Sequence, residues 1–232
     1  MNILAFDTCF DACSAAAGRG LRTLTPSIAT AFEPMAIGHA ERLMPMIESV
    51  MRSSGLAYSD LDRIAVTVGP GTFTGTRISV AAARALSLAT GVAIVPISSL
   101  MLMAMNPAVS CGECRTLVIA TDARRGEVYL QSFDSHSLRA LSPAVAVALA
   151  DIAGKIGAGP VVIAGSGASI VIDAARNAGI EATAMMPDLL PDAFDMLFAA
   201  ADWPAAANVE PLYLRPPDAK PPLSTLLVSA SA

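Results

Sequence analysis

Short blocks of apolar and polar positions divide the first half of the chain into strands and helices. Alternation over short β-branched or Ala-rich runs favours strands, whereas apolar residues at spacings of three and four favour helices. We expect three strands, then a helix, a strand, a helix, a strand and a helix, over residues 2–7, 12–18, 23–32, 41–54, 64–68, 76–89, 92–96 and 98–105. The glycine- and proline-containing breaks between these blocks mark the turns.

The second half repeats this order. We expect a hairpin of strands over 115–122 and 127–133 around 123–126, a weak third strand near 137–141, a helix over 145–156, a strand over 161–164, a helix over 168–177, a strand over 181–184 and a helix over 191–201. Each half begins with a strand that ends in aspartate, Asp7 and Asp122, and each aspartate is followed by a hairpin. The pattern predicts a duplicated α/β fold with two βββαβαβα halves.

This duplication sets the expected domains. Residues 1–106 form an N-terminal subdomain, residues 107–215 form a C-terminal subdomain, and the Pro-rich tail 216–232 is irregular. Ligands of open α/β sheets bind beyond the carboxyl ends of the strands, which is where both aspartates are expected.

Composition narrows the classes of partner. Of the 232 residues 54% are apolar and only 15% are charged, which favours a second large surface buried by a protein partner. The net charge of −5 and the absence of a basic run argue against a chain that binds nucleic acid without a partner. The first residues lack a signal-peptide pattern, and the longest apolar region is interrupted, so we expect a cytoplasmic protein without a membrane span.

A glycine-rich run follows the strand over 64–68 and reads Gly69-Pro70-Gly71-Thr72-Phe73-Thr74-Gly75-Thr76-Arg77. A strand, a glycine loop and a helix start can form an anion cradle. The run lacks the lysine of a Walker loop and the spacing of a dinucleotide fingerprint. The alternative is a tight turn that directs the following helix, and the lack of supporting phosphate ligands favours it.

A nucleotide site is the second hypothesis. Asp7 and Asp122 at strand ends suit a magnesium–phosphate complex of an actin-like ATPase, and Gly165 lies in a loop where that fold contacts adenosine. The hairpin after Asp7 lacks a phosphate-wrapping glycine. The other hairpin carries Arg124 and Arg125, which can fill a phosphate pocket or bind a phosphate. A degenerate cleft is the favoured alternative.

The sequence contains few of the residue patterns that would indicate a metal site or a catalytic nucleophile. The two histidines, His39 and His136, are far apart in sequence, and Leu43 rather than histidine stands four residues after His39. The four cysteines comprise Cys9, Cys13 and a Cys111-Gly-Glu-Cys114 pair with the spacing of half a zinc site. Four reduced thiols are the favoured alternative.

The chain resembles the bacterial TsaB (YeaZ) family. The resemblance rests on five segments in order, Ile3-Leu4-Ala5-Phe6-Asp7-Thr8, His39-Ala40-Glu41-Arg42-Leu43-Met44-Pro45, Gly69 to Ile78, Asp122-Ala123-Arg124-Arg125-Gly126-Glu127-Val128-Tyr129 and Pro211-Leu212-Tyr213-Leu214-Arg215. It implies the actin-like (ASKHA) fold and an accessory, non-catalytic role in making threonylcarbamoyladenosine beside the anticodon of tRNAs that read codons starting with A.

The resemblance also implies partners. The catalytic subunit is TsaD, which binds a metal through a His-x-x-x-His pair, and TsaE is an ATPase that joins the complex. The Ala-rich helix is thin, and a thin helix edged by arginines suits a protein seam. The implied interface, which can also support a homodimer, comprises His39, Arg42, Leu43, Met46, Thr74, Arg77, Ile78, Ala81, Arg84 and Ala85.

No cofactor or metal is required of the chain under this interpretation. Weak binding of ATP or ADP with Mg²⁺ at the cleft or at the interface of the complex stays open, and tRNA is expected to act only indirectly. The alternatives are an ATP-binding actin-like enzyme and a metallopeptidase, an older label for relatives of TsaD. Two distant histidines disfavour the latter.

Overall fold

Two five-stranded sheets with the same internal order form the framework of the molecule. The computed structural model describes residues 1–109, 111–112, 114–157 and 159–215. The first sheet has the order β3-β2-β1-β4-β5, and the second has the order β10-β9-β6-β7-β8. Read from its other edge, the second sheet runs β8-β7-β6-β9-β10, so each of its strands corresponds to the strand five numbers lower in the first sheet. The strands are β1 (Ile3–Asp7), β2 (Ala12–Arg19), β3 (Ser27–Pro34), β4 (Arg63–Thr67), β5 (Ala93–Ile97), β6 (Thr116–Asp122), β7 (Glu127–Asp134), β8 (Val145–Ala148), β9 (Val161–Ala164) and β10 (Ala182–Met185).

Strand directions repeat as well as strand order. The central strand β1 runs antiparallel to β2 and parallel to β4, and β6 runs antiparallel to β7 and parallel to β9. Asp7 is paired with Ser14 and Asp122 with Val128, so the two aspartates end equivalent central strands. The prediction of a duplicated α/β fold is confirmed.

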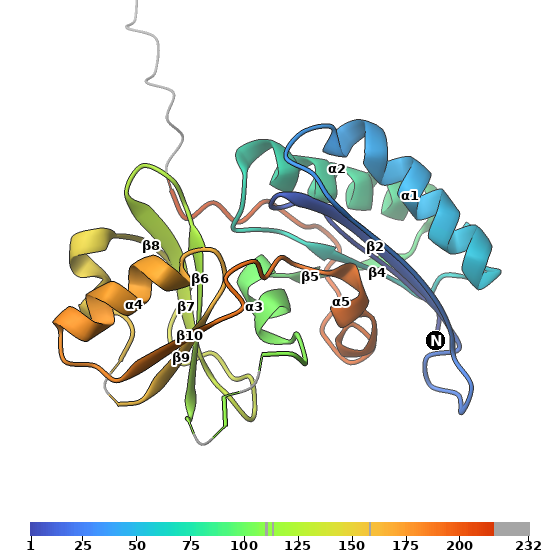
Figure 1. Cartoon of the computed structure of the whole chain (residues 1–232). Helices are drawn as coiled ribbons and strands as arrows, with labels where there is room; N and C mark the ends of the chain where they lie inside the picture. Colours follow the sequence, from blue (N-terminus) through green and yellow to red (C-terminus); the bar gives the residue numbers. More distant parts are fainter. Residues whose placement is uncertain (110, 113, 158, 216–232) are drawn as a thin grey trace, which may run out of the picture.

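Helices cover the outer face of each sheet (Figure 1). In the first half, α1 (His39–Ser54) packs on β2 and β3, and α2 (Phe73–Thr90) packs on β4 and β5. In the second half, α4 (Ala168–Asn177) packs on β9 and β10, and the 3₁₀ helix η2 (Leu149–Gly154) packs against α4 and β8. The first half therefore carries two long helices, and the second carries one shorter helix and a 3₁₀ segment. A further 3₁₀ turn, η1 (Tyr58–Asp60), precedes β4.

The last helix of each half packs on the sheet of the other half. Helix α3 (Ser99–Ala104) contacts β6 and β7, whereas α5 (Ala193–Ala199) contacts β1 and β2. Leu102 of α3, however, also joins Ala5 and Met196 in the apolar cluster beneath the first sheet. The two halves therefore share cores, because both short helices lie between the sheets (Figure 1). The predicted boundary between residues 106 and 107 stays a prediction.

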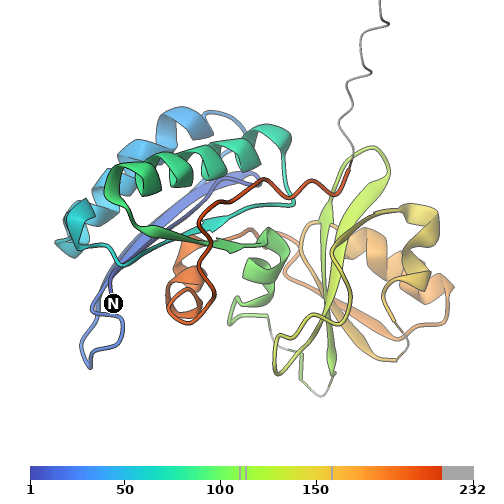
Figure 2. The same cartoon turned by 180° about the vertical axis from the view of Figure 1, so that it is seen from behind.

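The end of the described chain returns to the first half as a strap, residues 203–215. The Ala206 N–H donates to the Ile94 carbonyl at 2.7 Å, and the Leu212 N–H donates to the Val68 carbonyl at 2.7 Å. Figure 2 shows this strap running beside α2 and then reaching the hairpin of the second half. There the Arg215 guanidinium donates to a backbone carbonyl, that of Ala123, at 2.9 Å. The predicted irregular tail 216–232 lies outside the described residues.

One stretch of the second half corrects the sequence-based expectation. The predicted helix over 145–156 is wrong, because Val145–Ala148 forms β8 beside β7, and only Leu149–Gly154 is helical, as a 3₁₀ segment. The third strand is therefore β8 and not residues 137–141, where a single bridge joins Ala140 to Phe133. A short apolar run of alternating valine and alanine fits either structure, and pairing with β7 decides it.

Two helix starts also lie earlier than expected. Helix α1 begins at His39 after Gly38, which adopts a left-handed φ of 91°, and it accommodates Pro45 in its second turn. Helix α2 begins at Phe73, because the hydroxyl of Thr72 accepts a hydrogen bond from the Gly75 N–H at 3.1 Å and so caps the helix. Among the described residues, no helix is long and apolar enough to cross a membrane.

Candidate functional site: an exposed helix face and a closed cleft

Helix α2 presents one face to solvent and buries the other. The exposed positions recur at helical spacing and are Thr74, Arg77, Ala81, Arg84, Ala85 and Leu88, of which Leu88 is 89% exposed. The buried positions are Gly75, Thr76, Ser79, Val80 and Ala83. The exposed side chains at the centre of this face are alanines, so the surface there is flat. Two arginines flank it. Figure 2 shows α2 in front of α1, with the chain's last described segment running beside it.

An aromatic pair extends this face at the start of α2. The rings of Phe73 and Tyr213 are stacked with centroids 5.7 Å apart, and they remain 53% and 44% exposed. The Arg77 guanidinium lies 3.5 Å from the Phe73 ring centroid, and its Nε donates to the Tyr213 hydroxyl at 2.7 Å. Exposed aromatic rings held by a cation are typical of interface anchors. We call Phe73, Thr74, Arg77, Ala81, Arg84, Ala85, Leu88 and Tyr213 the α2 face.

Sequence reasoning did not select Phe73 or Tyr213 as interface residues. Both stand in segments that carry the family resemblance, the glycine-rich run and the Pro211–Arg215 segment. Their proximity depends on the strap, which brings residues 140 positions apart into contact. The Arg84 guanidinium similarly donates to the Asn208 side-chain oxygen of the strap at 2.6 Å.

Helix α1 contributes fewer exposed residues to the predicted partner interface than expected. Leu43 and Met46 are each 1% exposed and belong to the core under the first sheet's outer helices, so the structure places them inside and not on the predicted interface. Ile78 of α2 is partly buried against the same core. The exposed side of α1 carries Met44 and Arg42, and the Arg42 guanidinium pairs with Glu33 at 2.6 Å.

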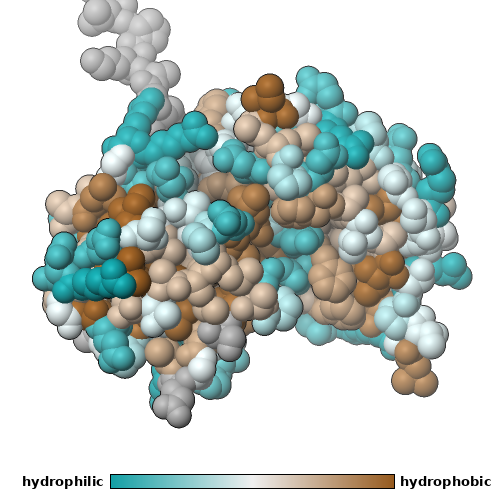
Figure 3. Space-filling model, viewed as in Figure 1, coloured by the Kyte–Doolittle hydropathy of each residue, from teal (hydrophilic) through white to brown (hydrophobic). Residues whose placement is uncertain are grey.

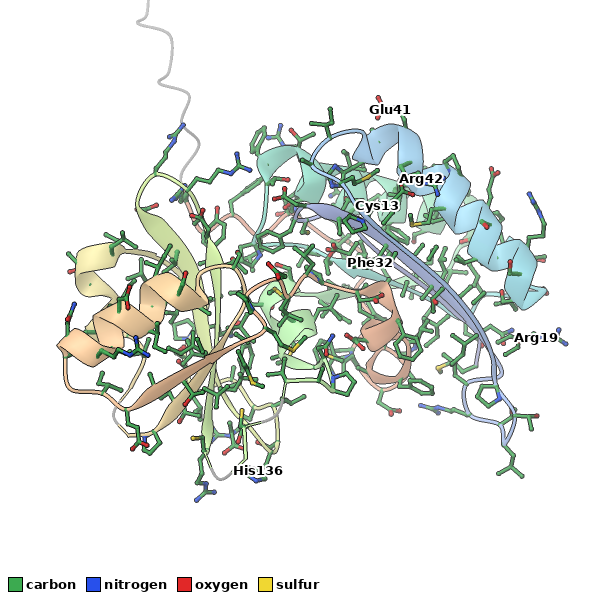
Figure 4. All side chains as sticks on the ribbon, in the orientation of Figure 1. Cys13, Arg19, Phe32, Glu41, Arg42 and His136 are labelled. Atoms are coloured by element: carbon green, nitrogen blue, oxygen red, sulfur yellow. The ribbon has the colours of Figure 1, made fainter. Side chains whose placement is uncertain are left out.

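His39 is held inside the chain. It is 8% exposed, and its Nε2 lies 2.9 Å from the Phe10 carbonyl oxygen. One turn later the buried Leu43 side chain fills the position where a second histidine would be needed for a His-x-x-x-His metal site. Figure 4 shows Arg42 on α1 above the strands that carry Phe32 and Cys13.

The glycine-rich loop is closed by the chain's own hairpin. A Cβ on Gly75 would lie 1.9 Å from the Thr8 carbonyl oxygen, and a Cβ on Gly71 would lie 2.3 Å from the Cys9 carbonyl oxygen. The Thr72 N–H donates to that Cys9 oxygen at 2.7 Å. These glycines therefore allow backbone to approach backbone, and the tight-turn interpretation of the run fits this geometry better than a phosphate cradle.

Asp7 is fully buried beside this loop. Thr67 donates a short hydrogen bond to Oδ1, the Cys9 N–H donates to the same oxygen at 3.2 Å, and Oδ2 has no hydrogen-bond partner among the residues that the structure describes. Burial raises the pKa of Asp7 from 3.8 to about 6, and the hydrogen bonds from Thr67 and Cys9 work against this rise.

The second half closes its turn in the same manner. A Cβ on Gly165 would lie 2.3 Å from the Ala120 carbonyl oxygen, and the Gly167 N–H donates to that oxygen at 3.0 Å. Asp122, in contrast, is exposed, and its Oδ1 accepts from the Arg124 N–H at 2.7 Å. The three predicted nucleotide residues thus all serve local packing or turns. Nucleotide binding stays a prediction, and this geometry does not favour it.

The described part of the chain has no cluster of three or more histidine, cysteine or acidic side chains positioned to hold a metal ion. Figure 3 shows hydrophobic and hydrophilic residues interspersed on the face of the molecule opposite the exposed side of α2. The α2 face is therefore the candidate functional site.

The sequence of this chain is similar to a known family model and to a known protein. The family model described as TsaD, tRNA N6-adenosine threonylcarbamoyltransferase, matches residues 33–211. The TsaB protein of Escherichia coli (strain K12), described as a tRNA threonylcarbamoyladenosine biosynthesis protein, is 31% identical over 226 residues, which cover 93% of this chain and 95% of that protein. The chain belongs to the TsaB family.

Solved structures agree with this membership. YeaZ from Pseudomonas aeruginosa superposes with a TM-score of 0.72 at 28% identity and covers 87% of this chain and 91% of its own. A second structure, described as an uncharacterized protein with similarity to peptidase YEAZ from the same organism, gives a TM-score of 0.75 at 27% identity over 92% of this chain and 99% of its own. The resemblance of this chain to the TsaB (YeaZ) family is confirmed.

Proposed function

We propose that the chain is a non-catalytic subunit that docks the transferase TsaD through the α2 face. Family membership supports the broader role, which is in tRNA threonylcarbamoyladenosine biosynthesis. The observation that carries the docking proposal is the exposure of the α2 face. A thin, alanine-rich centre with an aromatic pair at one end and Leu88 toward the other is suited to close helix packing.

The interior of the first half supports a role without chemistry of its own. His39 is bonded to the Phe10 carbonyl, and Leu43 is buried where a second metal-binding histidine would stand. The glycine-rich loop is filled by the backbone of Thr8 and Cys9. We infer that α2, and not the interior of the first half, is the functional part of this half.

Docking can be tested by adding a charge at the centre of the α2 face. Ala85→Glu and Ala81→Glu each place a carboxylate where close helix packing would bury it, so we expect co-purification with TsaD to fall by roughly tenfold or more. Ala150→Glu adds the same group to an exposed alanine of η2 in the second half and is the matched control. Circular dichroism and a thermal melt establish that each variant is folded.

Two results would separate the outcomes. Loss of TsaD for both α2 variants with retention for Ala150→Glu supports docking through this face. Equal co-purification of all three folded variants would contradict it. The same variants also test a homodimer, because sedimentation of the isolated chain reports whether the α2 face pairs with a second copy.

The ternary assembly with TsaE is part of the same proposal. We expect the mass of the complex of chain, TsaD and TsaE, measured with and without ATP, to show one copy of the chain beside one TsaD. Calorimetry of the isolated chain with Mg²⁺ and ATP tests the alternative, and heat of binding with one-site stoichiometry would favour a nucleotide site at the cleft.

A further inference from the structure

Cys111 and Cys114 lie between α3 and β6. The Cys114 N–H donates to the Cys111 carbonyl at 2.9 Å, and Gly112 adopts a left-handed φ of 53°. A backbone hydrogen bond between residues three apart is typical of Cα atoms that lie within about 7 Å of each other. Separations in this range overlap those that a disulfide spans, so the backbone permits a bridge between the two cysteines.

Both thiols are free and half-buried in this structure. Cys111 and Cys114 pack against the apolar cluster that contains Leu117 and Phe133. Burial raises the pKa of the Cys111 thiol, the neighbouring Cys114 adds to this rise, and a hydrogen bond with Ser135 works against it.

A hydroxyl and an imidazole stand beside the pair. The Ser135 hydroxyl donates to the Cys114 carbonyl at 2.8 Å and lies 3.1 Å from Nδ1 of His136. The Asp134 carboxylate accepts from the N–H of His136 at 3.3 Å and so fixes the turn that presents the ring. A proton can leave Cys111 by this path when the Ser135 hydroxyl turns from the Cys114 carbonyl toward Nδ1 of His136, accepts the thiol proton and donates its own to the ring.

The other two cysteines lack such surroundings. Cys9 and Cys13 are both fully buried, and burial raises the pKa of Cys13 to about 12. Figure 4 places Cys13 beneath α1 and His136 at the far end of the second half. Thiol chemistry in this chain is therefore expected at the 111/114 pair and not at the first hairpin.

We propose that Cys111 and Cys114 form a reversible redox site that is oxidised to an intramolecular disulfide by small disulfides such as glutathione disulfide. The Cys111 proton passes through Ser135 to His136, and the thiolate attacks one glutathione sulfur. This forms a mixed disulfide and releases one glutathione, which takes up that proton. Cys114 then attacks the Cys111 sulfur and releases the second glutathione with its own proton. Two protein thiols are oxidised while one glutathione disulfide is reduced to two glutathiones.

The test uses the full chain in glutathione buffers of varied ratio, followed by acid quench, alkylation and peptide mass spectrometry. We expect Cys111 and Cys114 to lose alkylation together as glutathione disulfide increases, with Cys9 and Cys13 unmodified until the chain unfolds. The midpoint should not depend on protein concentration, because the bridge forms within one molecule. Alkylation of both turn thiols at every ratio, or a bridge between molecules, would overturn the proposal.

Variants distinguish the order of attack. Cys114→Ser should trap glutathione on Cys111, whereas Cys9→Ser should leave formation of the 111/114 disulfide unchanged. Absence of the trapped adduct would overturn the assignment of Cys111 as the attacking thiol.

His136 is tested as a positioning residue by comparing rate with equilibrium. His136→Gln should slow oxidation by roughly tenfold while the midpoint glutathione ratio stays the same. A merely structural role would shift the midpoint as well, and an unchanged rate would remove His136 from the proton path.

Discussion

Asp7 and Asp122 end equivalent strands in the two halves, yet they have opposite environments. Asp7 is fully buried with one oxygen unpaired, and its pKa is raised to about 6. Asp122 is exposed, and its carboxylate accepts from the Arg124 N–H in the following turn. Topological equivalence therefore does not give chemical equivalence, because one strand end is covered by the rest of the chain and the other lies in solvent.

The turns behind the two aspartates are, in contrast, alike. Gly75 sits against Thr8 and Gly165 against Ala120, each with space for a hydrogen but not for a Cβ. The halves share this close backbone approach and differ in what covers it. In the first half this glycine lies in the first turn of the 18-residue helix α2, and in the second it precedes the 10-residue helix α4. The two halves thus share the close approach and differ in the length of the helix beside it.

The largest effect is expected at the shared turn. Gly75→Ala places a Cβ against the Thr8 carbonyl, and the backbone must move to relieve the overlap, so we expect a loss of about 3 kcal/mol or more in the free energy of unfolding. Gly165→Ala should cost a similar amount, because its φ of 104° adds strain to the overlap with Ala120. Urea unfolding provides the measurement.

Gly154→Ala is the matched control for both turns. A Cβ there would have no neighbour within 4 Å, so its effect should stay within about 0.5 kcal/mol. A cost at Gly75 no larger than the cost at Gly154 would contradict the close-approach account.

The second effect separates the two aspartates. Because burial raises the pKa of Asp7 from 3.8 to about 6, the folded state binds this proton more tightly than the unfolded chain. Its contribution to stability is therefore fully present below about pH 4 and is lost as pH rises through 6. We expect Asp7→Asn to raise the free energy of unfolding by about 1–3 kcal/mol at pH 7 and to bring no gain at pH 4.

Asp122→Asn is the comparison for that variant. Its carboxylate is already in solvent, so the substitution should change stability by less than about 0.5 kcal/mol at both pH values. Urea midpoints of the two variants at pH 7 and pH 4 provide the measurement. An Asp7→Asn variant with the same gain at both pH values would show that titration of Asp7 is not the cause.

A smaller effect is expected where the strap joins the two halves. The half-buried Arg215 donates to the Ala123 carbonyl at 2.9 Å and to the Arg124 carbonyl at 3.0 Å, and it pairs with Glu127. Arg215→Ala should therefore lower the free energy of unfolding by about 1–2 kcal/mol. Hydrogen exchange should rise in the hairpin around Ala123 and in the strap. Unchanged exchange at both segments would mean that Arg215 does not hold them together.

The smallest effect is expected on the exposed side of α2. Arg84 and Asn208 are both exposed, so Arg84→Ala should change stability by less than about 0.5 kcal/mol, as measured by thermal unfolding. A clear loss of stability would show that the strap depends on this contact as much as on Arg215.

Much of the fold follows from periodicity alone. Strand β9 and helix α4 have the predicted bounds. Leu43 and Met46, which were expected at the partner interface, lie in the core instead. The error at residues 145–156 arose because a short apolar run has no preference that local sequence can reveal, and β7 supplies the partner that makes it a strand.

The candidate site was predictable only in part. The spacing of Thr74, Arg77, Ala81 and Ala85 places them on one helix side, and the structure exposes that side. Their role in binding stays a prediction. Phe73 and Tyr213 are far apart in sequence, and no local pattern indicates that their rings stack. That contact depends on where the strap crosses α2.

The sequence by itself determined the duplication, the thin helix after the glycine-rich run and, apart from residues 137–156, the order of strands and helices. These features depend on local propensity and on periods of two and about 3.6 residues, which each segment carries independently. Tertiary structure alone decided that Asp7 is buried and Asp122 exposed, that the glycines contact backbone, and that the strap completes the α2 face. Burial and long-range contact depend on which segments meet, and that information does not reside in any one segment.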